Sequence, residues 1–379
     1  METSYFVSAL EQSGIDFFTG VPDSLLSAFC NEIVSRYGIG GGRHIVAHNE
    51  GGGVALASGY YLATGKIPCV YMQNSGIGNA LNPVASLTHP KVYAIPMLFV
   101  VGWRGEPGTK DEPQHVFQGE VTLELLADMD VEYVIIGEST TYEQLHTALS
   151  RFKELFEQGK SAAFVIRKNA FSDRDHAYTN AYALNREHAV EIVAKAAGND
   201  PVVSTTGKIS RELFEIRRKL GCGHEKDFLT VGSMGHSAMI ALGIALQQPY
   251  RRVWCLDGDG AVLMHMGSLG IVASEAPGNF IHVVFNNAAH ETVGGMPTAA
   301  GAMDLAAIAL ACGYSRAFKA EDPQALQEVL EENKKLCGPV FIEIYVALGS
   351  RSDLGRPTVE SRENKNAFMR FLTETGSSE

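Results

Sequence analysis

Short apolar runs alternate with segments of helical periodicity along nearly the whole chain. Such runs are typical of strands buried on both faces of a sheet, whereas apolar residues spaced three and four apart predict amphipathic helices. In the first half, strands are expected at residues 17–18, 44–47, 68–72, 95–101, 131–136 and 162–166. Helices are expected at residues 3–13, 24–37, 51–64, 78–88, 119–129 and 141–157.

The second half of the chain repeats this alternation. Strands are expected at residues 201–204, 228–231, 252–256, 280–285, 315–319 and 339–346. Helices are expected at residues 188–197, 209–219, 236–246, 262–274, 302–311, 323–335 and 366–372. Regular strand–helix alternation predicts mainly parallel sheets with helices on both faces, so the fold class is α/β with doubly wound sheets.

A polar stretch without either period separates the two halves. Residues 169–187 are therefore predicted to be a linker between two α/β domains, residues 1–168 and residues 188–379. A chain of 379 residues is long enough for two domains of this size.

The charge and cysteine content narrow the possible partners and location. Lys and Arg number 31 against 43 Asp and Glu, giving a net charge of −12. Since nucleic-acid binding needs a basic surface, we expect no nucleic-acid partner. No apolar run approaches the roughly 20 residues that span a bilayer, and the first residues do not resemble a signal peptide. With six scattered cysteines as reduced thiols, we expect a cytoplasmic protein without a membrane partner.

The most informative motif lies where two strands of the second domain end. Gly258-Asp259-Gly260 closes one predicted strand, and Asn286-Asn287 closes the next. The carboxyl ends of neighbouring parallel strands meet at one edge of a sheet, where α/β folds bind ligands. Carboxylate and amide oxygens suit Mg²⁺, and a strand–glycine–helix turn offers backbone amides to an anion. Either motif alone is an ordinary turn, but together they predict a site for a diphosphate and a metal.

With 26 residues between Gly260 and Asn287, the chain resembles the thiamine diphosphate enzymes, whose signature is Gly-Asp-Gly and, roughly two dozen residues later, Asn-Asn. The resemblance implies thiamine diphosphate and Mg²⁺ as cofactors, with Asp259, Asn287 and Ala289 as metal ligands. It also implies that a pyrimidine-binding domain precedes a diphosphate-binding domain. The other cofactor contacts that it implies are Thr206, Gly207, Gly232, Met234, Gly258, Gly260 and Ala261.

Two of these contacts have simpler interpretations as well. Thr206 and Gly207 follow the first strand of the second domain, where they could donate to the diphosphate or only cap a helix. In the family, a bulky apolar residue at the position of Met234 supports the bent shape of the cofactor. The alternative is a core methionine at the start of a helix.

Glu50 is the expected catalytic carboxylate. The segment from His48 to Tyr60 resembles the family's pyrimidine-domain motif, in which a glutamate opens a helix rich in glycine and alanine. The resemblance implies that Glu50 binds and protonates the aminopyrimidine ring, so that the cofactor becomes reactive. Taken alone, Glu50 is better explained as a carboxylate at a helix N-terminus, and the distant Gly258-Asp259-Gly260 motif reverses that preference.

Nearly the whole chain resembles the group of two-domain decarboxylases that act on phosphonopyruvate and sulfopyruvate. The resembling segments are residues 20–24, 102–108, 111–115, 206–213, 286–295 and 354–357. The expected substrate-binding residues are Asp23, Ser24, Arg104, Lys110, His115, Arg351 and Arg356. The cations among them could neutralise a small, multiply charged acid, although each could also be a solvated loop charge. His115 and His290 are the expected proton carriers.

The resemblance implies decarboxylation of 3-phosphonopyruvate to phosphonoacetaldehyde and carbon dioxide, in phosphonate biosynthesis. Sulfopyruvate is the nearest alternative substrate; it is disfavoured because the sulfopyruvate enzymes are expected to carry the two domains on separate subunits. Transfer of the product fragment to an acceptor aldehyde and a catalytically silent cofactor-binding subunit are two further alternatives. Retention of Glu50 disfavours a silent subunit. The family also implies a homodimer or a dimer of dimers with each active site between two subunits.

Overall fold

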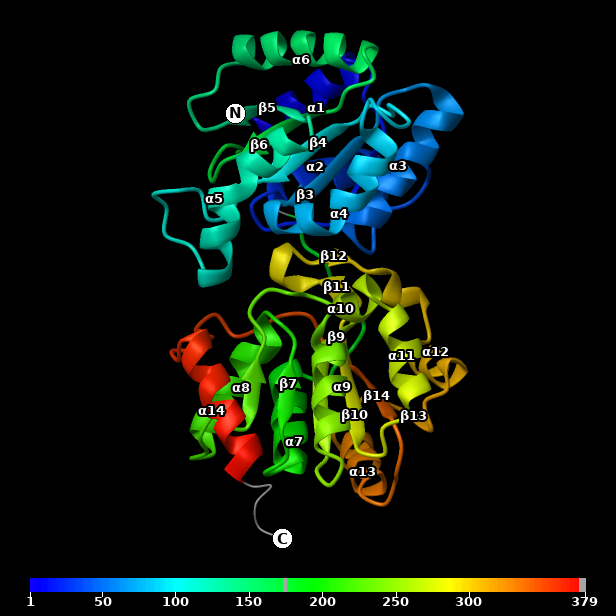
Figure 1. The fold of residues 1–379 in the computed structure, drawn as a ribbon, viewed down its shortest axis with the longest axis vertical. Coiled ribbons are helices and arrows are strands. Elements are labelled where there is room, and N and C mark those ends of the chain that lie inside the picture. The colour runs from blue at the N-terminus through cyan, green and yellow to red at the C-terminus, as the bar shows by residue number, and fades with distance from the viewer. Residues whose placement is uncertain (173–175, 375–379) are drawn as a thin grey trace. The chain divides into compact units, whose positions relative to one another are not determined.

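The computed structural model describes residues 1–172 and 176–374. The chain divides into two compact units, Met1–Ala177 and Tyr178–Glu379. Figure 1 shows the first in blue to green and the second in green to red. The division falls in the stretch 169–187 that we expected as a linker, part of which lies outside the described residues.

The first unit is built on a six-stranded sheet in which all paired strands are parallel. Its strands are β1 (Phe18–Gly20), β2 (His44–Val46), β3 (Cys69–Gln73), β4 (Leu98–Gly102), β5 (Glu132–Ile136) and β6 (Ala162–Ile166). Their order across the sheet is β2-β1-β3-β4-β6-β5. The strand order therefore reverses between β1 and β3, and such a reversal leaves a crevice at the carboxyl ends of the two strands.

Helices cover both faces of this sheet (Figure 1). They are α1 (Thr3–Gln12), α2 (Ser27–Tyr37), α3 (Glu50–Thr64), α4 (Ile77–Pro83), α5 (Pro113–Asp128) and α6 (Tyr142–Glu157), with short turns η1 (Asn74–Gly76) and η2 (Val84–Thr88). On one face, Phe164 of β6 packs edge-on against Phe6 of α1. Its neighbours Ala163 and Val165 point to the other face, where they join a buried cluster with α3, α4 and α5.

The second unit has a six-stranded parallel sheet of the same topology. Its strands are β7 (Val202–Ser204), β8 (Asp227–Leu229), β9 (Val253–Gly258), β10 (Phe280–Asn286), β13 (Arg316–Ala320) and β14 (Val340–Tyr345). The order β13-β14-β10-β9-β7-β8 is the order of the first sheet read from its other edge. Strands β7 and β9 thus correspond to β1 and β3. A separate antiparallel pair joins β11 (Ala289–His290) and β12 (Met296–Pro297).

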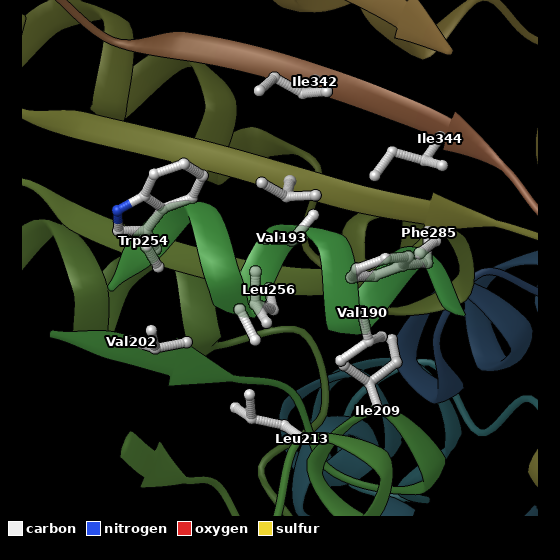
Figure 2. Packing of buried hydrophobic residues seen from close by; sticks show 14 of the residues in the cluster. Val190, Val193, Val202, Ile209, Leu213, Trp254, Leu256, Phe285, Ile342 and Ile344 are labelled. Carbon is white, nitrogen blue, oxygen red and sulfur yellow. The ribbon is translucent and has the colours of Figure 1, made fainter. Parts of the chain in front are cut away.

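The helices of the second unit form two layers around this sheet. They are α7 (Arg186–Ala197), α8 (Lys208–Lys219), α9 (Ser237–Gln247), α10 (Asp259–Met264), α11 (Gly267–Glu275), α12 (Leu305–Cys312), α13 (Pro323–Asn333) and α14 (Ser361–Glu374), with turns η3 (Glu291–Val293) and η4 (Ala299–Ala302). Trp254 and Leu256 of β9 pack with α7, α8 and α13, as Figure 2 shows in part. Val253 and Cys255 point to the opposite layer of α9, α11 and α12.

Helix α14 covers the edge strand β8. The Asn364 side chain donates to the Asp227 carbonyl at 2.8 Å and accepts from the Leu229 amide at 3.1 Å. It therefore satisfies backbone groups that an edge strand would otherwise leave unpaired. No helix among the described residues is both long and apolar enough to cross a membrane.

Several predicted helix boundaries are wrong. The helix expected at 119–129 begins at Pro113, because proline at the first helical position needs no amide donor. The helix expected at 262–274 is two helices, α10 and α11, interrupted at His265 and Met266. The helix expected at 366–372 extends over Ser361–Glu374. The pair β11–β12 was not predicted.

We expect Leu256→Ala to destabilise the second unit. Leu256 is fully buried between α7, α8 and the sheet (Figure 2), so its truncation leaves a cavity costing about 2–5 kcal/mol. Urea unfolding followed by tryptophan fluorescence measures this loss, since Trp254 lies in the same cluster. Leu310→Ala, at a side chain that is 47% exposed, is the control. Equal midpoints for the two variants would contradict the assignment of Leu256 to the core.

Candidate active site

Glu50 is the first residue of α3, at the carboxyl edge of the first sheet. The Asn49 side chain caps this helix by accepting a hydrogen bond from the Gly52 amide at 2.7 Å. The Glu50 carboxylate is buried, and its Oε2 accepts from Asn79 Nδ2 at 2.8 Å. A Cβ at Gly76 would lie 2.3 Å from Glu50 Oε1. Glycine at position 76 therefore makes room for the carboxylate.

Asp23 lies in the loop after β1 and is fully buried. Its carboxylate accepts from Gln73 Nε2 at 2.5 Å and from the Leu25 amide at 3.2 Å. Burial raises the pKa of Asp23, while the Gln73 hydrogen bond and the charge of Arg104 oppose that rise. A Cβ at Gly102 would lie 2.3 Å from Asp23 Oδ2, so the end of β4 packs directly on this group.

Arg104 follows β4 and is held in a fixed orientation. Its Nε and Nη2 donate to the two Asp111 carboxylate oxygens at 2.8 and 2.5 Å, and its Nη1 donates to Ser24 Oγ at 3.0 Å. Burial would raise the pKa of Asp111, but hydrogen bonds from Arg104 and from the backbone hold it below its usual range. The structure thus brings Asp23, Ser24 and Arg104 together, with the exposed Lys110 on the same loop as Asp111.

His115 lies in the first turn of α5 and is largely buried. Burial lowers its pKa, and the nearby charge of Arg104 lowers it further. The imidazole is therefore neutral at physiological pH. Its Nδ1 is buried and has no hydrogen-bond partner among the described residues. A neutral imidazole with one free nitrogen can accept a proton, and the imidazolium that results can donate it.

Asp259 is the first residue of α10, directly after β9. Its buried carboxylate accepts from the Thr298 hydroxyl and from backbone amides that include those of Gly260 and Asn287. Burial raises the pKa of Asp259 to about 7 in spite of these hydrogen bonds. These hydrogen bonds therefore do not fully stabilise the negative charge of the ionised Asp259 carboxylate. A bound cation can stabilise that charge further.

Asn287 follows β10 and touches Asp259 through its backbone amide. Its side-chain Oδ1 accepts from the Ala289 amide at 3.0 Å, and its Nδ2 donates to Glu291 Oε2 at 2.7 Å. Ala288 adopts φ +55°, in the left-handed region, so the chain turns sharply between Asn287 and Ala289. The turn places both predicted metal ligands of this loop beside the start of α10.

Met234 and His290 meet over Gly260. A Cβ at Gly260 would lie 3.3 Å from His290 Nδ1 and 3.4 Å from Met234 Cε. Burial lowers the pKa of His290 to about 4, so this imidazole is also neutral near pH 7. Ala261, the next residue of α10, is buried. The loop before α9 and the loop after β10 thus converge on the start of α10.

The loops after β7 and β8 are joined by one hydrogen bond. Thr206 Oγ1 accepts from the Gly232 amide at 3.1 Å. Gly207 has φ +100°, a conformation that favours glycine, and it directly precedes α8. The Thr205 hydroxyl is buried and has no hydrogen-bond partner among the described residues. A free hydroxyl and helix N-termini at one sheet edge suit a diphosphate.

Arg351 and Arg356 lie in the stretch between β14 and α14. Arg351 forms ion pairs with Glu187 at 3.0 Å, with Asp353 at 3.1 Å and with Glu215. Arg356 is exposed. Three carboxylates already balance the charge of Arg351, which makes it less suited than Arg104 to bind an anionic substrate.

The predicted residues of the second unit fit a metal-bound diphosphate. Asp259 and Asn287 provide hard oxygen ligands of the kind that Mg²⁺ prefers, and Gly207, Gly258 and Gly260 let an anion approach the backbone closely.

Sequence reasoning missed four residues that hold predicted site residues in place, two in each unit. They are Gln73, Asn79, Glu291 and Thr298, which contact Asp23, Glu50, Asn287 and Asp259. Only Glu291 had a sequence signal, because it is four residues from Asn287 inside a segment already singled out.

Two family models match the chain, both of thiamine pyrophosphate enzymes, for which thiamine diphosphate is another name of the cofactor. The N-terminal TPP binding domain matches residues 3–129. The C-terminal TPP binding domain matches residues 205–344. The first match contains Glu50 and the second contains Asp259 and Asn287.

Curated relatives match over nearly the whole chain. Phosphonopyruvate decarboxylase of Streptomyces viridochromogenes is 35% identical, covering 97% of this chain and 94% of its own. Phosphonopyruvate decarboxylase of Streptomyces hygroscopicus is 34% identical, covering 99% and 94%. Sulfopyruvate decarboxylase of Methanosarcina acetivorans is 26% identical, covering 91% of each chain.

The third relative corrects one expectation. A sulfopyruvate decarboxylase that aligns over both units in one chain shows that the fused architecture does not separate the two activities. The higher identity to the phosphonopyruvate enzymes, over almost the full length of both chains, still distinguishes the two groups. With both cofactor-binding domains matched as well, the chain belongs to the thiamine diphosphate-dependent decarboxylases, in the family that includes phosphonopyruvate decarboxylase.

Proposed function

We propose that this carboxy-lyase converts 3-phosphonopyruvate to phosphonoacetaldehyde and carbon dioxide with thiamine diphosphate and Mg²⁺. The similarity to two phosphonopyruvate decarboxylases over almost the full chain carries the proposal. In the reaction the bond between the carboxylate and the keto carbon breaks, and a proton takes the place of carbon dioxide. The product places the protein in phosphonate biosynthesis, and its six free cysteines suit the cytoplasm as the proposed location.

The second unit holds the cofactor's diphosphate in this proposal. Asp259 and Asn287, with the carbonyl of Ala289, bind Mg²⁺. The residues that line the diphosphate are Thr206, Gly207, Gly232, Gly258, Gly260 and Ala261. Their support is the contact of Asp259 with the Asn287 amide and the Thr206–Gly232 hydrogen bond.

Glu50 and Met234 act on the other parts of the cofactor. Glu50 would hold a proton at its carboxylate for the aminopyrimidine ring, and Asn79 keeps that carboxylate in place. Met234, next to Gly260, would support the bound cofactor. When bound, thiamine diphosphate supplies the electron sink that makes loss of carbon dioxide possible.

Residues at the edge of the first sheet bind the anionic substrate. Arg104 is oriented by Asp111 and presents an N–H beside the Ser24 hydroxyl. Lys110 adds an exposed positive charge, and Asp23 fixes the loop after β1 through Gln73. A planar guanidinium next to a hydroxyl is a good receptor for a phosphonate. Arg356 stays a prediction as a further contact.

Two neutral imidazoles are available for proton transfer. Burial lowers the pKa of both His115 and His290. A neutral imidazole can accept the proton released when the product leaves, and the imidazolium so formed can donate the proton that replaces carbon dioxide. We assign these steps to His115 and His290 without ordering them.

Sulfopyruvate is a second candidate substrate. A full-length relative acts on it by name, and a sulfonate has nearly the tetrahedral shape of a phosphonate. A catalytically silent subunit is less consistent with the structure, because Glu50 keeps its buried position and its Asn79 partner.

The first test measures carbon dioxide release by the purified protein with thiamine diphosphate and Mg²⁺. We expect fast turnover of 3-phosphonopyruvate, slow turnover of sulfopyruvate and pyruvate, and none without the cofactor. Analysis of the product separates simple decarboxylation from transfer to an aldehyde. Absence of turnover with all three acids would return the silent subunit as the better explanation.

Glu50→Gln should lower turnover of 3-phosphonopyruvate by about 10²-fold or more while the circular dichroism spectrum stays unchanged, because an amide cannot share the required proton. Gly76→Ala should act in the same direction, since its methyl group displaces the carboxylate. Gly78→Ala is the matched control on α4, as a Cβ there meets nothing within 4 Å. Near-normal turnover of Glu50→Gln would remove Glu50 from this role.

We also propose a homodimer, or a dimer of dimers, in which Glu50 of one subunit serves the cofactor held by the partner subunit. Light scattering during size-exclusion chromatography should therefore give at least twice the chain mass of 40.9 kDa. Activity that stays with a monomeric fraction upon dilution would contradict the shared site.

A further inference from the structure

Glu291, in the turn after β10, contacts the side chain of a proposed metal ligand. Its Oε2 accepts from Asn287 Nδ2 at 2.7 Å. Its other contacts are with two cations, Arg186 of α7 and Lys208 of α8, the latter at 2.8 Å. The Glu291 side chain is only 10% exposed. Glu291 therefore joins the loop after β10 to two helices of the second unit.

The position and charge of Glu291 are well defined. Arg186 is itself buried and forms a two-fold hydrogen bond with Glu212, at 2.8 and 2.9 Å. Its ion pairs with Arg186 and Lys208 make Glu291 a charged acceptor and restrict its movement.

An asparagine that binds a metal through its side-chain oxygen needs a hydrogen-bond acceptor beside its side-chain nitrogen to fix its orientation. The oxygen and nitrogen ends of a carboxamide have almost the same shape, but only the oxygen binds a metal. A carboxylate accepts hydrogen bonds and donates none, so Glu291 fixes the Nδ2 end of Asn287 on its own side. Oδ1 then lies toward the Ala289 amide, with its second lone pair left for a cation.

We propose that Glu291 is a positioning residue that orients the Asn287 carboxamide for metal binding. The inference rests on the proposed function, because it takes Asn287 to be a ligand of the metal that holds the diphosphate. Groups that orient metal ligands typically change metal affinity by 10–100-fold when they are removed. We expect removal of the Glu291 carboxylate to weaken metal binding by a factor in this range.

A purely structural role makes a different prediction. If Glu291 served only to neutralise Arg186, its loss would resemble the loss of Glu212, the other carboxylate on the same guanidinium. Glu212 is buried as well, yet its described hydrogen bonds are with Arg186 and not with Asn287. Glu212→Gln is therefore a matched control that removes a carboxylate of Arg186 and keeps the Asn287 partner.

The experiment measures Mn²⁺ binding by electron paramagnetic resonance, in the presence of thiamine diphosphate and without substrate. Free Mn²⁺ gives a signal that disappears upon binding, so the readout does not depend on turnover. We expect Glu291→Gln and Glu291→Ala to weaken Mn²⁺ binding by about tenfold or more, and Glu212→Gln to change it by less than about twofold. Melting temperatures show whether each variant is folded, and the conservative Glu291→Gln keeps the shape of the side chain.

Glu291→Gln in a chain that already carries Asn287→Asp tests the contact between Glu291 and residue 287. Asn287→Asp keeps an oxygen ligand but places a carboxylate against Glu291, and in that background Glu291→Gln supplies a donor to the new acceptor. We expect the second substitution to strengthen Mn²⁺ binding there, opposite to its effect in the native chain. The same loss in both backgrounds would show that the two residues act independently and would overturn the proposal.

The wild-type protein separates this inference from the proposed function. If the wild type does not bind Mn²⁺ together with thiamine diphosphate, the proposed function fails and the positioning role fails with it. If the wild type binds but both Glu291 variants bind equally well, or Glu212→Gln is equally impaired, only the positioning role of Glu291 is overturned.

Discussion

The burial of the Asp259 carboxylate is the constraint on which the second unit's site depends. Its position between β9 and α10 removes it from water, and one hydroxyl and several backbone amides only partly compensate for the lost hydration. In the proposed function, a bound divalent cation would restore the balance, with the Asn287 side-chain oxygen of the neighbouring loop as a second ligand. The turn with φ +55° at Ala288 fits the same requirement, because it folds the chain back after Asn287.

The repeated topology explains where the chemistry is located. Both sheets reverse their strand order between corresponding strands, β1 and β3 in one and β7 and β9 in the other. Asp23 follows β1, and Asp259 follows β9. Because β9 is the counterpart of β3 and not of β1, the two loops are not equivalent, but each follows one of the two strands at which its sheet reverses its strand order. The two loops differ in composition, so the crevices of the two units are lined by different side chains.

Much of this arrangement could be predicted from the sequence, because buried parallel strands are continuous apolar runs. The strand at Ala162–Ile166 was predicted with its observed bounds. Strand ends then indicated Asp259 and Asn287, and the family resemblance added Glu50. The residues that support them could not be found in this way: Thr298 reaches Asp259 from 39 positions away, and Asn79 reaches Glu50 from 29. Such contacts depend on how loops fold over the sheet edge, which local periodicity does not encode.

In the proposed function, charge rather than shape is the property by which the residues around Arg104 would distinguish the two candidate acids. A sulfonate carries one negative charge at all physiological pH values, whereas a phosphonate can lose a second proton. Asp111 balances the charge of Arg104, so this pair alone offers an oriented donor with little net charge. The exposed Lys110 on the same loop adds the positive charge that a dianion needs. Selectivity for the phosphonate would therefore depend on Lys110, while Arg104 and Ser24 would serve both anions.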